Sequence, residues 1–441
     1  MGDGADMGAE RHGDPPGSDE TSEPTGRCIV VLSEQVAGDP GASASALASM
    51  AGVSSVASSR EFKDGAVDLE QTRSSDATLF AELGVAVVTV DPSGGGAMAA
   101  LATEDPRILA VEPERVQRAL EEQPVSPEYV RGFRAGVSSL YGRVADAAAE
   151  LGAAPSFADS VEFTWGLAAT RAASSSRTGA NIAVAILDSG LDLAHPDFAG
   201  RPIVSRSFVA GQTVQDGGGH GTHTVGTSCG PADPPGPSRR YGVATEAKIF
   251  VGKVLSDRGF GADGQILAGI NWALANNVHV ISMSLGIELN QVSQAYETVG
   301  QRALAAGTLI VAAAGNNADR AAGYMGFVGI PANSPSILAV AAVDANLRIA
   351  NFSSRSSAGT GGRIDIAAPG VAIYSSWPMP DRYHTNSGTS MAAPHVAGIA
   401  ALVSQATGAR GAELWSKLIQ GAQPLNLPSV DVGAGLVQAP S

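Results

Sequence analysis

The sequence predicts an α/β protein whose larger part is a doubly wound, mostly parallel sheet, preceded by a smaller α/β domain. The first observation is a set of five apolar runs without polar alternation, at residues 182–188, 247–255, 278–286, 307–315 and 336–344. Such runs are typical of strands covered on both faces. The second observation is the helical segments between them, such as GQILAGINWALANN, because helices that alternate with buried strands build parallel sheets.

The first 160 residues differ from the rest of the chain in composition and predict three further parts. Residues 1–26 are acidic, rich in Gly and Pro and poor in large apolar groups, which is typical of disorder. Residues 27–118 predict the small domain, with strands at CIVVLSE, GVAVVTVD and RILAVEPERV and helices after Gly41 and over 95–106. Residues 119–160 predict a linker with a peripheral helix over 137–154, and residues 161–441 predict the larger domain.

Composition narrows the possible functions. The chain has 441 residues, of which 44% are hydrophobic, enough for a large core and a smaller unit. A formal net charge of −15 argues against nucleic acid or an anionic membrane surface as a partner. The two cysteines, Cys28 and Cys229, are too few for a disulfide framework, and we expect them unbridged. No apolar run reaches 18 residues, so we expect no membrane span, and no signal peptide is visible.

Four polar side chains stand at strand ends or at helix starts of the larger domain: Asp188, His220, Asn316 and Ser390. Polar groups gather at the carboxyl ends of parallel strands. An imidazole can take the proton of a serine hydroxyl, and a buried carboxylate can orient that imidazole. An amide N–H beside the serine can stabilise an oxyanion. Ser390 lies within NSGTSMAAPHVAG, in which small residues leave room for an approaching substrate and Pro394 predicts a first helical turn.

Each of these residues also has a purely structural interpretation. Asp188 could cap a helix or bind a ribose, and Asn316 beside Asn317 could form a turn. His220 could be a packed core histidine or half of a metal pair with His223, although the i, i+3 spacing lacks the glutamate of zinc-helix motifs. Taken singly, most favour the structural interpretation, whereas taken together the four favour a catalytic site.

The motifs around these residues resemble those of the subtilisin-like serine peptidases. VAILDSGLDLAHPDF, HGTHTVGT, AAAGNN and GTSMAAPHVAG are similar to the aspartate, histidine, oxyanion and serine motifs of that family, in the same order along the chain. The resemblance covers residues 165–439. It implies that Ser390 is the nucleophile, His220 the general base and then acid, Asp188 its orienting partner and Asn316 the oxyanion donor. It also implies that His195, His223 and His395 are structural.

The same resemblance implies a cleft for polypeptide substrates. The substrate strand would pair with Ser284, Leu285 and Gly286 and with a second segment over 312–315, by strand addition to a sheet edge. Ala314, Gly315 and Gly329 would line a roomy, mostly apolar pocket for the residue before the cleaved bond. No cofactor is required. Many relatives hold calcium through an aspartate that matches Asp197, but the loop GPADPPGPSRRYG is a poor cation cage, so we assign no metal ligands.

Residues 27–118 resemble the inhibitor-like propeptide of secreted subtilases, mainly through CIVVLSE and ILAVEPERV. That resemblance implies a ferredoxin-like fold and an intramolecular inhibitor whose C-terminal tail threads through the cleft. A template that binds the native state would help a slowly folding parallel sheet. We expect self-cleavage of this zymogen between about residues 114 and 160. The resemblance points to secretion, whereas no leader is visible.

The primary hypothesis is a serine endopeptidase that acts through an acyl-enzyme. The alternative is a catalytically silent subtilase-fold module that binds peptides, although every catalytic position is filled. A nucleotide-binding α/β protein is disfavoured because no phosphate-binding glycine motif is present. An α/β-hydrolase esterase is disfavoured because Ser390 lies in Gly-Thr-Ser-Met-Ala, which lacks the second glycine of the nucleophile elbow.

Overall fold

The larger part of the chain is built on a seven-stranded sheet in which every neighbouring pair of strands is parallel. The computed structural model describes residues 25–50, 52–89, 105–120, 156–236, 238–357, 359 and 361–441. In pairing order the strands are β15 (Ile366–Pro369), β14 (Leu338–Val343), β13 (Leu309–Ala313), β11 (Val280–Met283), β7 (Ala183–Asp188), β9 (Lys248–Lys253) and β8 (Ile203–Ser207). Each of the five apolar runs supplies one strand of this sheet, which confirms the predicted parallel sheet.

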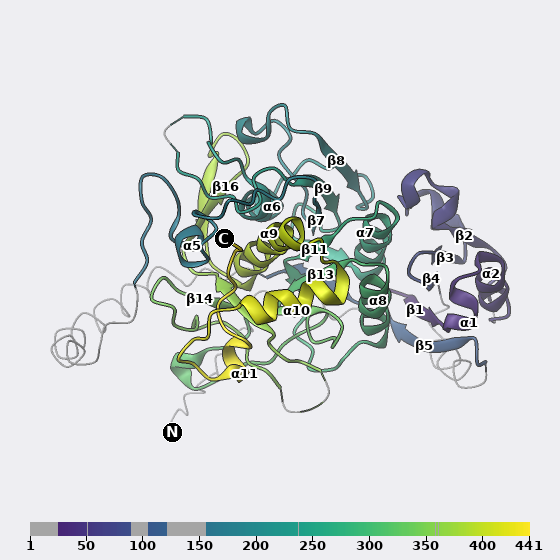
Figure 1. Cartoon of the computed structure of the whole chain (residues 1–441). Helices are drawn as coiled ribbons and strands as arrows, with labels where there is room; N and C mark the ends of the chain where they lie inside the picture. The colour runs from purple at the N-terminus through teal and green to yellow at the C-terminus, as the bar shows by residue number, and fades with distance from the viewer. Residues whose placement is uncertain are drawn as a thin grey trace, which may run out of the picture.

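Helices cover both faces of this sheet (Figure 1). Helices α7 (Asp263–Ala275) and α8 (Gln294–Ala305) pack on one face, and α6 (His220–Cys229), α9 (Thr389–Thr407) and α10 (Gly411–Gly421) pack on the other. Side chains of β7 alternate accordingly: Ala185 and Leu187 join the α7 side, whereas Val184 and Ile186 join the α9 side. Burial on both faces explains why the strand sequences lack polar alternation.

The N-terminal part forms a second, five-stranded sheet. Its pairing order is β2 (Val56–Ser58), β3 (Ala77–Phe80), β4 (Val85–Thr89), β1 (Arg27–Leu32) and β5 (Ile108–Pro113), with α1 (Glu34–Ala37) and α2 (Pro40–Ala48) packed against it. The three strands and the first helix predicted for this part are present. The expected helix over 137–154, most of the one over 95–106 and nearly all of the acidic tail lie outside the described residues.

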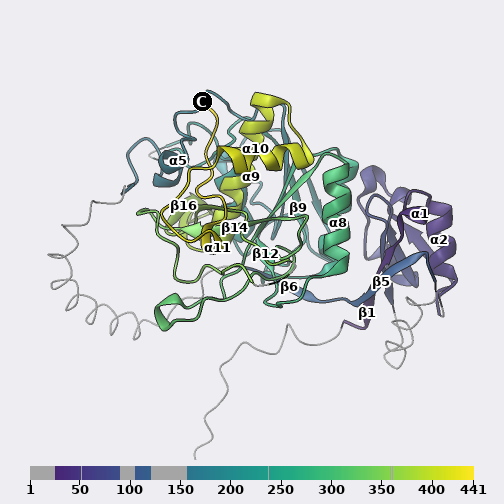
Figure 2. The same cartoon turned by 60° about the horizontal axis from the view of Figure 1, so that its bottom comes forward.

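The N-terminal sheet packs against α7 and α8 of the larger part (Figure 1), and Figure 2 shows α8 beside it from a second direction. The contact is mainly apolar: Phe80, Leu83 and Val85 share one core cluster with side chains of these helices. Two carboxylates from the β5 end of the sheet also accept the free N–H groups at the helix starts. Glu112 accepts from the main-chain N of Gln294 at 2.6 Å, and Glu114 accepts from that of Gly264 at 3.0 Å.

A third, three-stranded sheet joins the two parts. Strand β6 (Val116–Ala119) follows the N-terminal sheet and lies between β10 (Phe260–Ala262) and β12 (Leu285–Gly286) of the larger part, antiparallel to both. The remaining α-helices and strands of the described residues are α5 (Trp165–Ala169), the hairpin of β16 (Ile373–Ser376) and β17 (Tyr383–Asn386), and α11 (Ser429–Val432). Cys28 and Cys229 are buried and unbridged, as expected. Among the described residues, no helix has the length and apolar character needed to cross a membrane.

Candidate active site

Asp188 and His220 are joined by a direct contact. Asp188 is the last residue of β7 and His220 the first of α6, so the sheet and the helix hold the two from different sides. The Oδ1 atom of Asp188 lies 2.7 Å from Nδ1 of His220, and both residues are buried. Asp188 also accepts from the main-chain N of Ser189 and from the Thr224 hydroxyl. These contacts orient the imidazole ring relative to the carboxylate.

The turn before His220 is held by a second buried carboxylate, Asp216. One of its oxygens accepts from the main-chain N of Gly219 at 2.8 Å and from the Ser189 hydroxyl at 3.0 Å. The other accepts the main-chain N of Thr222 at 2.7 Å. Gly219 has a φ of +95°, and a Cβ there would collide with the Trp377 ring, so only glycine fits this turn. The turn therefore fixes where α6 begins.

Ser390 is the second residue of α9, and it is fully buried. Its hydroxyl donates to the main-chain oxygen of Ser284 at 3.0 Å, and the Ser284 hydroxyl donates to the main-chain oxygen of Ser390 at 2.8 Å. Pro394 lies in the second helical turn rather than the first, so that expectation is wrong. Because proline has no N–H, it cannot donate to the Ser390 oxygen four residues earlier, and Ser284 supplies that hydrogen bond instead. Helix α9 packs against α6, which carries His220.

Asn316 lies beside the start of α9. Its Oδ1 atom accepts from the main-chain N of Thr389 at 2.9 Å and from the Thr389 hydroxyl at 2.8 Å. The amide nitrogen therefore points the other way, and it donates to the main-chain oxygen of Leu120 at 2.8 Å. Leu120 is the residue that directly follows β6, so Asn316 contacts the chain's own N-terminal part.

Residues 116–120 lie between β10 and β12, and the space between these two strands is called the groove below. The main-chain N of Leu120 donates to the Ser284 oxygen at 3.3 Å, which is the same oxygen that accepts from Ser390. One residue earlier, the main-chain N of Ala119 donates to the Gly259 oxygen at 2.9 Å. In register, Arg118 lies opposite Gly286 on one side and opposite Phe260 on the other. The groove thus holds an extended peptide by its main chain on both edges.

The structure brings some of the predicted substrate-binding residues to this segment and not others. Ser284, Leu285 and Gly286 lie along it, and a Cβ on Gly286 would come within 3.2 Å of the Leu120 side chain. The segment over 312–315 does not pair with β6, because Ala312 and Ala313 belong to β13 and pair with β11 and β14. The second neighbour of β6 is β10, which the sequence analysis missed because Phe260–Ala262 is too short to show a period.

The three small residues predicted for the apolar pocket, Ala314, Gly315 and Gly329, lie next to one another. Ala314 is buried, and its main-chain oxygen accepts from Gly329 at 3.1 Å. Gly315 donates its main-chain N to the Thr389 hydroxyl. Leu120 itself is buried.

The other histidines of the motifs bind backbone carbonyls inside the fold. His195 contacts the main-chain oxygen of Arg382, His223 that of Ile373 and His395 that of Met391, at 2.8–2.9 Å. Burial lowers the pKa of His223 to about 3 and that of His395 to about 4, so both rings are neutral near pH 7. These contacts support the structural role expected for all three.

The surroundings of Asp197 do not fit a bound cation. One carboxylate oxygen accepts from the Arg382 guanidinium at 3.2 Å and from the Tyr383 hydroxyl, and the other accepts from the Tyr241 hydroxyl at 2.5 Å. A guanidinium already supplies the positive charge at this carboxylate, and tyrosine hydroxyls that donate to it are not cation ligands. Across the part of the chain that the structure describes, no group of three or more His, Cys, Asp or Glu side chains is arranged to hold a metal.

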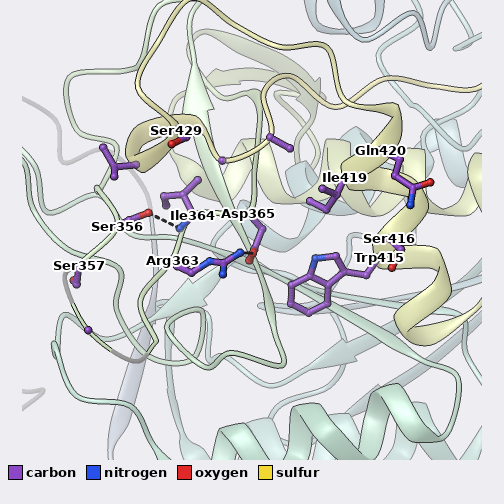
Figure 3. Close-up of a pocket in the computed structure, with 14 residues that line it drawn as sticks. Ser356, Ser357, Arg363, Ile364, Asp365, Trp415, Ser416, Ile419, Gln420 and Ser429 are labelled. Atoms are coloured by element: carbon purple, nitrogen blue, oxygen red, sulfur yellow. Dashed lines mark hydrogen bonds and ion pairs between the residues drawn. The ribbon is translucent and has the colours of Figure 1, made fainter.

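An open pocket of about 810 Å³ lies apart from this site, between α10 and the loops near α11 (Figure 3). Its lining includes Arg363, Asp365 and Trp415. On one side, the main-chain N of Ile364 donates a hydrogen bond to the Ser356 hydroxyl. Burial raises the pKa of Asp365 to about 6. None of the four candidate catalytic residues lines this pocket.

The chain belongs to the subtilase family. Residues 179–432 match the family described as the Subtilase family, and this range covers more than half of the chain. The match agrees with the fold, in which a parallel sheet places Asp188, His220, Asn316 and Ser390 at strand ends and helix starts.

Several named subtilisins are similar to this chain. It is 43% identical to Subtilisin E of Bacillus subtilis (strain 168) over 228 residues, which are 51% of this chain and 56% of that protein. It is 42% identical to Subtilisin of Bacillus pumilus over 228 residues, or 51% and 78% of the two chains. It is 40% identical to the Thermostable alkaline protease of Halalkalibacterium halodurans over 258 residues, or 58% and 66%. The chain spans little more than half the length of Subtilisin E.

Proposed function

We propose that this chain is a serine endopeptidase that hydrolyses peptide bonds through an acyl-enzyme, and that it is made as a zymogen that cleaves itself. The alternative is a peptide-binding module without activity. Family membership favours the enzyme, since all four positions that a subtilase needs carry the required side chains. In this proposal Ser390 is the nucleophile, His220 the base, Asp188 its orienting partner and Asn316 the oxyanion donor.

The observation that carries the proposal is the hydrogen bond from the Asn316 amide to the carbonyl oxygen of Leu120. An oxyanion donor lies about 2.7–3.1 Å from the position that the oxyanion will occupy. The Asn316 nitrogen lies 2.8 Å from the carbonyl oxygen on which that charge would form. The Leu120 N–H donates to the same Ser284 oxygen that accepts from the Ser390 hydroxyl, so Leu120 and Ser390 share one backbone acceptor. The bond between Leu120 and Glu121 is therefore the proposed cleavage site.

The chemistry follows from these positions. Attack requires the Ser390 hydroxyl to turn from the Ser284 oxygen and give its proton to His220, while Oγ bonds to the Leu120 carbonyl carbon. Negative charge then develops on the Leu120 oxygen, where the Asn316 N–H already points. His220 returns the proton to the departing amine of Glu121, which leaves Leu120 esterified to Ser390. Water, deprotonated by His220, hydrolyses that ester and restores the enzyme.

The N-terminal part is proposed to act as an intramolecular inhibitor. Its sheet covers α7 and α8, and its tail fills the groove that a substrate would need. Two buried or half-buried carboxylates, Glu114 and Glu112, add charge-assisted hydrogen bonds at the helix starts. After cleavage these contacts would keep the released segment bound, so removal of the segment is expected to be a separate step.

The test compares the wild-type chain with Ser390→Ala by intact mass. We expect the wild-type chain to yield a fragment that ends at Leu120 and a second one that begins at Glu121, whereas Ser390→Ala stays uncut. Ser387→Ala, in the same glycine-rich stretch, is the matched control, because the Ser387 hydroxyl only accepts from the main chain of Ala372. It is expected to be cut like the wild type.

Two results would contradict the proposal. Trimming of Ser390→Ala at the same bond would mean that another protease makes the cut. A wild-type chain that remains whole and takes up no serine-directed organophosphate, measured as added mass, would favour the silent peptide-binding module.

A further inference from the structure

Gln117 is fully buried between two polar side chains of the larger part. Its side-chain nitrogen lies 2.6 Å from Oδ1 of Asp263 and 2.8 Å from the hydroxyl of Tyr296. Asp263 is the first residue of α7 and Tyr296 lies in the first turn of α8, and neither exposes any surface. Buried polar groups of this kind are costly unless each is hydrogen-bonded, so the occupant of this pocket matters energetically.

The hydrogen bonds in this pocket run in one direction. The Tyr296 hydroxyl donates its proton to Oδ1 of Asp263 at 2.8 Å. Its oxygen can therefore only accept from Gln117, and the Asp263 carboxylate also only accepts. Both hydrogens of the Gln117 amide are thus used, while its Oε1 atom has no hydrogen-bond partner among the described residues. The pocket recognises N–H groups.

The pocket has a defined position along the cleft. Counting back from the proposed cleavage site, Leu120 is the first residue and Gln117 the fourth, and Gln117 lies opposite Gly261 of β10. Oδ2 of Asp263 accepts from the main-chain N of Arg115 at 2.8 Å, two residues further back. The main-chain bond to Oδ2 can form with an extended peptide of any sequence. The bond to Oδ1, in contrast, depends on the side chain of the fourth residue before the proposed cleavage site.

We propose that Asp263 and Tyr296 form a specificity subsite that selects a side chain with N–H donors and no negative charge, of the size of glutamine, at the fourth residue before the cleaved bond. This inference rests on the proposed peptidase function and names part of its substrate class. A peptide with glutamine at that position satisfies both groups, as Gln117 does.

The expected selectivity follows from the acceptors that other side chains would leave without a hydrogen-bond donor, Asp263 and Tyr296. Methionine has nearly the size of glutamine, but it would bury Asp263 and Tyr296 without their donor. Glutamate has the same shape, but it would place a second carboxylate against Asp263. Leaving a buried polar group without its partner typically costs a factor of about 10 to 100 in kcat/KM.

The experiment uses the matured wild-type enzyme and three peptides with the sequence of residues 115–120, each followed by a fluorogenic amide. Position 117 is glutamine, methionine or glutamate, so the six residues reach the main-chain contact at Arg115 in every peptide. We expect kcat/KM for the glutamine peptide to exceed both others at least about tenfold. Equal cleavage of all three would overturn the subsite and leave the peptidase proposal intact. Cleavage of none by an enzyme that is free of its N-terminal segment and takes up no serine-directed organophosphate would overturn both.

A variant pair then assigns the effect to Asp263. Asp263→Leu, made together with Gln117→Met so that the tail still fits the pocket, is expected to reverse the preference toward the methionine peptide. Glu288→Gln is the matched control, because Glu288 pairs with the neighbouring Arg118 at 2.5 Å and lies outside the pocket. It should keep the wild-type order of the three peptides. An unchanged order in the Asp263 variant would contradict the assignment.

Discussion

Asn316 uses the two ends of its amide for different tasks. Its oxygen accepts two hydrogen bonds from Thr389, the residue before Ser390, and this leaves the nitrogen directed at the Leu120 oxygen. An amide that is held at its oxygen cannot turn away as charge develops on the substrate, so no reorganisation is needed at that moment. In the proposed mechanism, Asn316 would therefore act through preorganisation.

We expect Asn316→Ala to lower kcat for peptide hydrolysis by about 100- to 1000-fold with little change in KM, because the donor stabilises charge that appears only in the transition state. Asn316→Asp is the informative partner, since it keeps an acceptor for Thr389 and removes the donor. It should be at least as inactive. Both constants are measured on matured enzyme, and the thermal midpoint shows whether each variant is folded. A variant that is folded and retains wild-type kcat would contradict this role.

At the scale of elements, the β16–β17 hairpin is held to the segment that follows β7. Arg382, next to β17, bonds to the carboxylate of Asp197 and to the main-chain oxygen of Pro235, and Tyr383 adds its hydroxyl. Burial raises the pKa of Tyr383 to about 12, so this hydroxyl stays a donor at any ordinary pH. The proline-rich loop is therefore held at Pro235 by the guanidinium of Arg382.

We expect a chelator such as EDTA in excess to leave the thermal midpoint of the uncut Ser390→Ala chain unchanged, because Arg382 supplies the charge that a metal would bring to Asp197. Arg382→Ala in the same background should lower the free energy of unfolding by about 1–3 kcal/mol, since it removes the charged partner of a buried carboxylate. Urea unfolding measures this loss.

Arg363→Ala is the control for that variant, because the Arg363 side chain is 79% exposed and its nearest carboxylate is 4.0 Å away. A drop in midpoint on chelation would show that a metal does stabilise the chain.

At the scale of the whole molecule, buried titratable groups oppose one another in their effect on stability. His223 and His395 have lowered pKa values, so their contribution to stability is complete above pH 6.5 and is lost as the pH falls through the folded values. Asp263 and Asp365 behave in the opposite sense. Burial raises the pKa of each from 3.8 to about 6, so their contribution is complete below pH 3.8 and is lost as the pH rises through 6.

Asp365 offers a clean test of that balance. We expect Asp365→Asn, in the Ser390→Ala background, to raise the free energy of unfolding at pH 7 by about 1–3 kcal/mol, because an amide needs no proton to remain neutral. Its oxygen can still accept from the main-chain N of Ala339, as the carboxylate does at 2.9 Å. At pH 4 the difference should nearly vanish, and urea unfolding at the two pH values measures it. The same gain at both pH values would contradict the titration.

Several features on which the proposals depend could not be predicted from the sequence. Leu120 and Gln117 lie in a polar stretch with no motif, and the roles proposed for them depend on the pairing of β6 with β10 and β12. From the sequence alone, Asp263 resembles any acidic residue in the first turn of a helix, and Tyr296 resembles any aromatic residue of a helix. The segment over 312–315 was expected beside the bound peptide, but β13 uses its edges to pair within the large sheet.

The amino-acid sequence by itself determined the family, the parallel sheet and the four candidate catalytic residues. These are written in local patterns: uninterrupted apolar runs between helices, and short motifs in which glycine and polar residues have fixed neighbours. Only the tertiary structure decided which bond lies against Asn316, which strand borders the groove, and that the carboxylate of Asp197 lies against Arg382. Each of these depends on groups far apart along the chain, such as Asn316 and Leu120, whose contact is set by how sheets and helices pack and leaves no periodic trace in either segment.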